Sequence, residues 1–545
     1  MLRSLTFAAL TLALLSSCGQ KSTLPAEDDG LAAINADSLK QHIAVLASDS
    51  FEGRKPFTIG ETKTIAYLQE QFAAAGLEPG NGKSYLQDVP MVSIKAIAAP
   101  SMEVRSAKGS FNLKAFDDYI IWTDKTDPDI ALTANDLVFA GYGIVAPEYQ
   151  WNDYEGLDVK GKVVMVMVND PGFRDSTLFK GKTMTYYGRW TYKFEEAARQ
   201  GAKGCLIVHN TAAASYGFNV PQNSFNTTKL QLDNRGKDIK KCDVVGWIQE
   251  PVAKKLLIAA GLDTAQLVAA QKKGFKPVDM HLALSTTMKV EAVYNMSHNV
   301  IGKITGSKYP DQVIIYTSHW DHLGIGKPDE TGDSIYNGAY DNASGAAGLI
   351  ELARAFKSMK TKPERSIVIL SVTSEEQGLL GSAYYAQNPV YPAKNTVANI
   401  NIDELSRFDK TKDIVVVGKG QSDLEDILKE EAEKMGRYTA YESHPEAGHY
   451  FRSDHFNFAK AGIPALYINN GIDVVGKGKE YGQKIDDEYN ERNYHRPSDS
   501  FDAATWSMAG GVDDLQLLFR VGRRVAFGEK TPQWKDGSEF KALRK

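Results

Sequence analysis

Three apolar stretches of strand length in the second half of the chain each lead into residue types that bind metal ions. The first ends before His319, the second before the adjacent pair Glu375 and Glu376, and the third before Asp403. In open α/β sheets, ligands bind where the strands end at their carboxyl edge. We therefore expect these side chains to gather at one edge of a sheet. The stretches are 313–317, 366–372 and 397–402.

The pair Glu375 and Glu376 indicates a bound cation. Two bare carboxylates directly after a fully apolar strand would repel each other and lose hydration, and a cation offsets that cost. A mixture of imidazole and carboxylate ligands favours zinc or a similar first-row divalent ion over calcium. Taken singly, each signal has a simpler interpretation: His319 could be a structural hydrogen-bonding residue, and Asp341 could be only a helix N-cap.

The elements that position these residues follow from the pattern of apolar residues. Apolar positions three and four apart predict helices over 38–46 and 60–76, and strand-like stretches follow near 86–104. Residues 137–168 predict strands separated by turns. After about residue 286, strands and helices alternate, which predicts an α/β unit with a largely parallel sheet.

Five motifs in the second half resemble, in order, those of the co-catalytic di-zinc metallopeptidases that include bacterial leucyl aminopeptidase, aminopeptidase Y and glutamate carboxypeptidase. Between the N-terminal part and these motifs lies a segment whose order of strands and helices resembles a protease-associated insert. The resemblance implies a three-layer α/β sandwich with a mixed, mostly parallel central sheet, plus a smaller β-rich protease-associated domain. The motifs are Ser318-His319-Trp320-Asp321, 337–345, 374–378, Asn401-Ile402-Asp403 and 494–499.

The resemblance implies two zinc ions per chain. Asp341 would bridge them, His319 and Asp403 would complete one site, and Glu376 and His495 would complete the other. Each ion would then keep an open position for water, as a catalytic zinc requires.

The resemblance also implies roles around the ions. Glu375 would be the general base that takes a proton from the attacking water. Tyr494 would donate to the oxyanion, or else only pack. Asp321 would accept the second N–H of the His319 ring and Asp499 that of His495, unless they are surface or turn carboxylates.

Four further residues are candidates for substrate contact. Glu404 departs from the family pattern and could bind a substrate amino group, whereas Arg407, Arg452 and His455 could contact substrate or serve structure only. We expect an aminopeptidase acting on peptides. The alternatives are a glutamate carboxypeptidase-like enzyme or dipeptidase, a single-zinc cyclase-type enzyme and, least favoured, a non-catalytic receptor-like protein.

The N-terminal region predicts export. Arg3, an apolar run over 5–15 and Cys18 are typical of a secretory signal whose end resembles a bacterial lipobox. We expect a lipid anchor on Cys18 and a place in the cell envelope, facing the periplasm or on the outer membrane or cell surface; an ordinary signal peptide is the alternative. Cys205 and Cys242 could form one bridge or stay free.

Length and charge complete the expectations. A chain of 545 residues predicts more than one structural unit, and a net charge of −5 without a run of Lys and Arg predicts no nucleic-acid partner. The expected segments are a lipoprotein signal peptide 1–18, a tether 19–35, the peptidase domain in two parts 36–125 and 286–545, and the insert 126–285.

Overall fold

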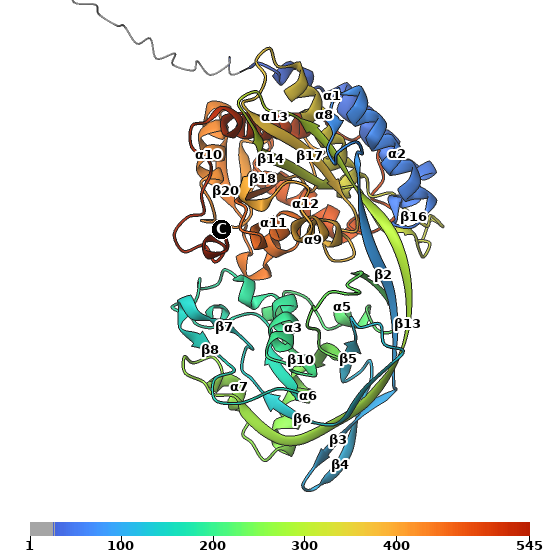
Figure 1. The fold of residues 1–545 in the computed structure, drawn as a ribbon, viewed down its shortest axis with the longest axis vertical. Helices are drawn as coiled ribbons and strands as arrows, with labels where there is room; N and C mark the ends of the chain where they lie inside the picture. The colour runs from blue at the N-terminus through green and yellow to red at the C-terminus, as the bar shows by residue number, and fades with distance from the viewer. Residues whose placement is uncertain (1–25, 27, 545) are drawn as a thin grey trace, which may run out of the picture.

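Two units, connected by a pair of long antiparallel strands, make up the computed structural model, which describes residue 26 and residues 28–544. The pair is β2 (Leu86–Ala98) and β13 (Val278–Ile304), matched residue for residue from Leu86 opposite Val300 to Ala98 opposite Met288. Figure 1 shows both strands running along one side of the molecule from the upper unit to the lower one.

The upper unit contains a mixed, mostly parallel sheet. Strands β17, β14, β18 and β21 are parallel neighbours, and antiparallel pairing adds β13 beside β17 and β19 beside β21. β1 pairs with β13 at one end, and β20 lies parallel to β19 at the other. The strands are β1 (Glu78–Pro79), β14 (Tyr309–His319), β17 (Arg365–Val372), β18 (Thr396–Asn401), β19 (Asp413–Val416), β20 (Tyr438–Tyr441) and β21 (Ala465–Asn469).

Helices cover both faces of this sheet. In β14, Ile314 and Tyr316 pack into one apolar cluster while Val313 and Ile315 pack into another, because successive side chains of a strand point to opposite faces. The predicted α/β sandwich with a mostly parallel sheet is confirmed. One face carries α1 (Ala36–Leu46), α2 (Ile59–Ala74), α8 (Ser344–Ser358), α10 (Leu424–Lys434) and α13 (Ala509–Phe527), and the other carries α9 (Leu380–Gln387) and α11 (His455–Lys460).

The lower unit contains the other part of the same continuous sheet, in which β6, β9, β10 and β12 are parallel neighbours and β6 pairs with β13. Residues 101–122 contribute Met102, Val104 and Tyr119 to its apolar core. The unit therefore begins well before the predicted boundary at residue 126, within β2. Its elements are β3 (Ser101–Ser106), β4 (Gly109–Lys114), β5 (Tyr119–Trp122), β6 (Asp129–Phe139), β7 (Val145–Ala146), β8 (Trp151–Asn152), β9 (Val163–Met167), α3 (Trp190–Arg199), β10 (Gly204–His209), α4 (Thr211–Ala214), α5 (Asn219–Gln222), β11 (Thr228–Leu232), β12 (Val244–Gln249), α6 (Glu250–Ala259) and α7 (Gln266–Ala269).

The structure tests the expectations for Cys205, Cys242 and the N-terminal tether. Cys205 and Cys242 are both buried and unbridged. Leu31 and Ile34 are buried in the core of the upper unit, so the folded part begins before the predicted end of the tether at residue 35. The predicted signal peptide and Cys18 lie outside the described residues.

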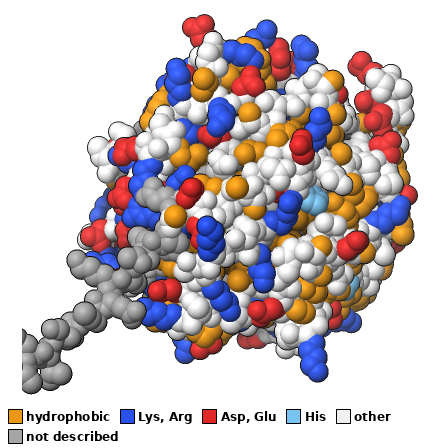
Figure 2. Space-filling view, turned by 90° about the horizontal axis from the view of Figure 1, so that it is seen from above, with side chains coloured by type: hydrophobic (Ala, Val, Ile, Leu, Met, Phe, Trp, Pro, Cys, Tyr) orange, Lys and Arg blue, Asp and Glu red, His pale blue; other side chains and the backbone are white. Residues whose placement is uncertain are grey.

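The helices and the molecular surface have two further features. Among the described residues, no helix combines the length and apolar character needed to cross a bilayer. On the face drawn in Figure 2, Lys and Arg side chains are interspersed with Asp and Glu. The remaining elements are β15 (Gly324–Ile325), β16 (Ile335–Tyr336) and α12 (Lys479–Arg492).

Candidate metal centre

The sequence-predicted ligands meet at the carboxyl edge of the upper sheet. His319 is the last residue of β14, Glu376 follows β17, and Asp403 follows β18. Asp341 lies in an irregular turn before α8, and His495 lies in the loop after α12. Parallel strands end at the same edge, so residues far apart in the chain become neighbours here.

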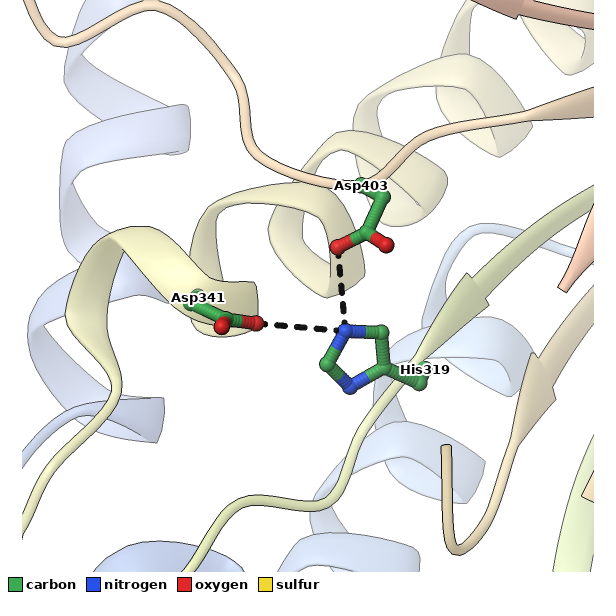
Figure 3. A group of neighbouring side chains, drawn as sticks. All are labelled: His319, Asp341 and Asp403. Carbon is green, nitrogen blue, oxygen red and sulfur yellow. Dashed lines mark hydrogen bonds and ion pairs between the residues drawn. The ribbon is translucent and has the colours of Figure 1, made fainter. Parts of the chain in front are cut away.

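His319 stands between two carboxylates (Figure 3). Its Nε2 lies 3.3 Å from Oδ1 of Asp341 and 3.0 Å from Oδ1 of Asp403. The His319 side chain is 1% exposed and that of Asp341 7%. These three residues form a compact group that could hold a metal ion.

A second group uses the other oxygen of Asp341. Nε2 of His495 lies 3.3 Å from Oδ2 of Asp341 and 3.1 Å from Oε2 of Glu376. The Asp341 carboxylate therefore faces His319 with one oxygen and His495 with the other. A shared carboxylate of this kind is what a bridging ligand between two ions requires.

The spacing of the donor atoms fits divalent metal ions. Zinc bonds of about 2.0–2.1 Å at tetrahedral angles place two ligand atoms about 3.3 Å apart. The four histidine–carboxylate distances around Asp341 lie between 3.0 and 3.3 Å. The residue types and their spacing are thus compatible with one ion in each group.

The charges in this centre depend strongly on one another. Burial acts to raise the pKa of Asp341, but hydrogen bonds with His319 and His495 outweigh it and hold that pKa well below the usual range. Burial and Asp341 act to raise the pKa of Glu376, whereas His495 and His322 lower it to about 2. Both carboxylates are therefore negatively charged and able to bind cations.

Glu375 has a different environment from its neighbour. Burial, with the charges of Asp403 and Glu376, raises its pKa well above the usual range, although His319 opposes this. Its backbone N–H donates to Oδ1 of Asp321 at 3.0 Å, which fixes the start of the loop. A carboxylate that lies beside the candidate metal ligands without being one of them is placed to accept a proton from water.

The two predicted supporting carboxylates lie elsewhere than expected. Nδ1 of His319 faces the backbone oxygen of Asp321 at 3.1 Å, while the Asp321 carboxylate is 3.8 Å away and accepts from Glu375 instead. Asp499 accepts from the backbone N–H groups of Tyr340 and Asp341, each at 3.1 Å. Asp499 therefore orients Asp341, not His495 as predicted.

Arg54 is a supporting residue that sequence reasoning missed. It is 1% exposed, and its guanidinium donates to the backbone oxygens of Trp320, Asn337 and Gly338, in the loops that follow His319 and precede Asp341. Burial lowers its pKa to about 10, and nearby carboxylates, including Asp499 and Asp341, oppose this. Its buried positive charge compensates the acidic centre, and no motif pointed to it.

Tyr494 lies beside the centre. Its ring stacks on His495, with the ring centres 3.9 Å apart, and its side chain is 44% exposed. A hydroxyl on a partly exposed ring at the mouth of the site is compatible with both predicted roles, oxyanion donor or packing.

Of the four predicted substrate contacts, Glu404 and Arg452 lie near the centre. The charges of Asp341 and Asp403 act on Glu404 and, together with burial, raise its pKa well above the usual range. Arg452 precedes Ser453, whose hydroxyl donates to Oδ2 of Asp403 at 2.6 Å.

The other two serve packing in this structure. The Arg407 guanidinium lies over the rings of Tyr340 and Tyr489, at 5.5 and 5.0 Å. His455 is 0% exposed between the rings of Tyr450 and Tyr467, and burial lowers its pKa to about 3. A fully buried ring between two aromatic residues offers substrate no accessible atom, so the predicted contact of His455 has no support here.

A cleft of about 910 Å³ lies between the two units beside the centre. The lower unit lines it with Trp122, Arg189 and Trp190, and the upper unit with Glu376 and Gln377. The units also contact each other directly at its rim, through the ion pair of Lys460 with Glu195 at 2.9 Å. The lower unit therefore forms one wall of the approach to the predicted metal ligands.

His322 also belongs to this centre, although the sequence indicated no role for it. It is 0% exposed, and its Nδ1 lies 2.6 Å from Oε1 of Glu376. It groups with Asp341 and Glu376 as a candidate ligand set. The signal was its place three residues after His319, on the loop that leaves the strand end.

Residues 299–519 match the family model described as Peptidase family M28. The match spans all five predicted ligands and Glu375, and it confirms the resemblance at the level of the family. The matched part is less than half of the chain.

Individual relatives match shorter parts of the chain. A protein of Leptosphaeria maculans named "Probable zinc metalloprotease" is 36% identical over 105 residues, which are 19% of this chain and 23% of that protein. Carboxypeptidase Q of Xenopus laevis is 23% identical over 245 residues, 45% of this chain and 42% of that protein. The chain thus aligns with less than half the length of either relative.

Among solved structures, an aminopeptidase from Aneurinibacillus sp. strain AM-1 superposes with a TM-score of 0.48 at 20% identity, covering 92% of this chain and 96% of that one.

Proposed function

We propose that this chain is a zinc-dependent aminopeptidase that removes N-terminal residues from peptides at a centre of two zinc ions. The observation that carries the proposal is the position of Asp341, whose two oxygens face His319 and His495 separately. His319 and Asp403 would hold one ion, and Glu376 and His495 the other. The match to Peptidase family M28 supports a peptidase.

The ions would activate water and polarise the scissile carbonyl group. Glu375 would accept the proton of the attacking water and pass it to the leaving amine, because its carboxylate lies beside His319 and Asp403. Tyr494, stacked on His495, can donate its hydroxyl to the developing oxyanion.

Glu404 supports a preference for a free amino terminus. Its carboxylate adds negative charge beside Asp341 and Asp403, and no Lys or Arg lies within 4 Å of it among the described residues. A partly buried carboxylate without a cation is costly, and a substrate α-ammonium group would relieve that cost.

A carboxypeptidase is the second candidate, and an arginine pair favours it. Arg189 on the lower unit and Arg452 on the upper unit are close enough that Arg452, after burial, contributes to lowering the pKa of Arg189 to about 10. Neither forms an ion pair with a carboxylate among the described residues. Nε of Arg452 is buried without a hydrogen-bond partner, so a substrate carboxylate could satisfy it.

The test is a comparison of a free tripeptide with its N-acetylated and C-amidated forms, using the wild type, Glu404→Gln and Arg452→Met. We expect cleavage of the free and C-amidated peptides only, and a fall in kcat/KM of about 100-fold in Glu404→Gln, since an interaction with a buried charge contributes about 2–5 kcal/mol. Arg452→Met should change cleavage of the C-amidated peptide less than about twofold.

Cleavage of the N-acetylated peptide alone, abolished by Arg452→Met, would establish the carboxypeptidase instead. Cleavage of neither blocked form would indicate a dipeptidase-like requirement for both termini.

Export and anchoring form a separate proposal. The run 5–15 followed by Cys18 supports a lipoprotein signal and attachment to the cell envelope. The lower unit, with its parallel strands and its place beside the cleft, is proposed to be a protease-associated domain.

A further inference from the structure

His322 lies in the candidate metal centre. Its ring nitrogen is closer to a carboxylate oxygen of Glu376 than the ring nitrogens of the predicted ligands are to theirs. The histidine–carboxylate pairs around Asp341 are 3.0–3.3 Å apart, close to the edge of a zinc tetrahedron, which is about 3.3 Å. Nδ1 of His322 is only 2.6 Å from Oε1 of Glu376. That separation is a short hydrogen bond and leaves no room for an ion between the two atoms.

The direction of this hydrogen bond is determined by charge. An ionised carboxylate has no proton to donate and can only accept, and Glu376 would be ionised as a ligand of a metal ion. His322 must therefore donate from Nδ1. Glu376 then accepts from His322 with Oε1 and faces His495 with Oε2.

The ring of His322 is held firmly in place. It is 0% exposed, and the Gly338 backbone lies so close that a Cβ on Gly338 would be 2.4 Å from Cγ of His322. Gly338 has a φ of +55°, in the left-handed region that favours glycine. His495, in contrast, is 35% exposed on a loop. The more rigid histidine is thus the one whose Nδ1 lies at short hydrogen-bond distance from Glu376.

We propose that His322 is a positioning residue that fixes Glu376 by donating from Nδ1 to Oε1, so that Oε2 is presented to the ion shared with Asp341 and His495. The inference rests on the proposed metal centre. Hydrogen bonds to ligating carboxylates orient them, and loss of such a partner weakens metal binding about 10–100-fold. His322 would set the affinity of the Glu376 site and leave the Asp403 site unchanged.

The experiment measures zinc affinity of the full-length chain by competition with a chromophoric chelator, with wild type, H322F and H322N. Asn can place an amide donor near the position of Nδ1, whereas Phe keeps the ring but has no donor. We expect two zinc ions in the wild type. One of the two dissociation constants should rise 10–100-fold in H322F and stay within about fivefold of the wild type in H322N, with the other constant unchanged in both.

A matched control is H444F, because the His444 side chain is 73% exposed and its Nδ1 lies 3.2 Å from Glu446, away from the predicted ligands. If circular dichroism shows that H322F does not fold, H322A replaces it. Unchanged zinc affinity in H322F, or equal loss in H322F and H322N, would overturn the positioning role. A wild type that binds no zinc would instead overturn the proposed function, so the two failures are distinguishable.

Discussion

Replacing Glu375 by Gln is expected to lower kcat by about 1,000-fold while the protein keeps its full zinc content. General-base catalysis contributes about 10²–10⁴-fold, and the amide of Gln cannot take a proton from water. Glu375 contacts none of the predicted ligands by a side-chain hydrogen bond among the described residues, so the centre should remain assembled. Single-turnover kinetics and metal analysis on the same preparation test the fall in rate and the unchanged zinc content.

The control for this variant is Glu330→Gln, an exposed glutamate in the loop after β15. It makes the same chemical change and should leave kcat within about twofold of the wild type. Undiminished turnover in Glu375→Gln would show that another group is the base, and loss of zinc would show that Glu375 is a ligand.

Replacing Asp341 by Asn is expected to abolish both zinc sites together. Asn keeps the shape of the side chain but removes the charge that faces His319 with one oxygen and His495 with the other. Activity should fall by at least about 1,000-fold, because metal-assisted polarisation and water activation are lost together. Calorimetric titration with zinc and kcat/KM measure the two effects.

Thermal unfolding provides a second readout for Asp341→Asn. Zinc at 100 times its dissociation constant should stabilise the wild type by about 2.7 kcal/mol per site, and this gain should vanish in the variant. Asp311→Asn, an exposed position at the start of β14, is the matched control and should keep the gain. Loss of only one site would contradict a shared carboxylate.

The residues at the strand ends were predictable because short stretches of sequence show both the apolar pattern of each strand and the alternation of strands and helices that implies a parallel sheet. An apolar run followed by His319 or Asp403 marks a strand end, and parallel strands bring such ends to one edge. Asp341 and His495, which follow no apolar strand, were predictable only from the motifs around them. The structure places all four side chains in the same centre.

The supporting residues were not predictable, because their contacts depend on tertiary geometry. Arg54 lies more than 260 residues before the loops that it holds, and Asp499 reaches the backbone of Asp341 and not the ring of His495. His322 could be paired with Glu376 only once the loop after β14 was placed. The sequence of each segment gives no indication of the other segment that it contacts.

The boundary between the units was misplaced for a related reason. β2 and β13 are continuous strands that belong to both units, so the apolar pattern does not change where one core ends and the next begins. Arg189 illustrates the consequence. It lies in the lower unit yet lines the cleft that leads to Glu376, a contact that only the arrangement of the two units creates.

The sharpest test of a two-ion centre organised by Asp341 is a crystal structure of the zinc-reconstituted chain with anomalous data collected at the zinc edge. We predict two anomalous peaks, one beside each oxygen of Asp341, the first also contacted by His319 and Asp403 and the second by Glu376 and His495. A single peak, or zinc bound away from Asp341, would contradict this arrangement.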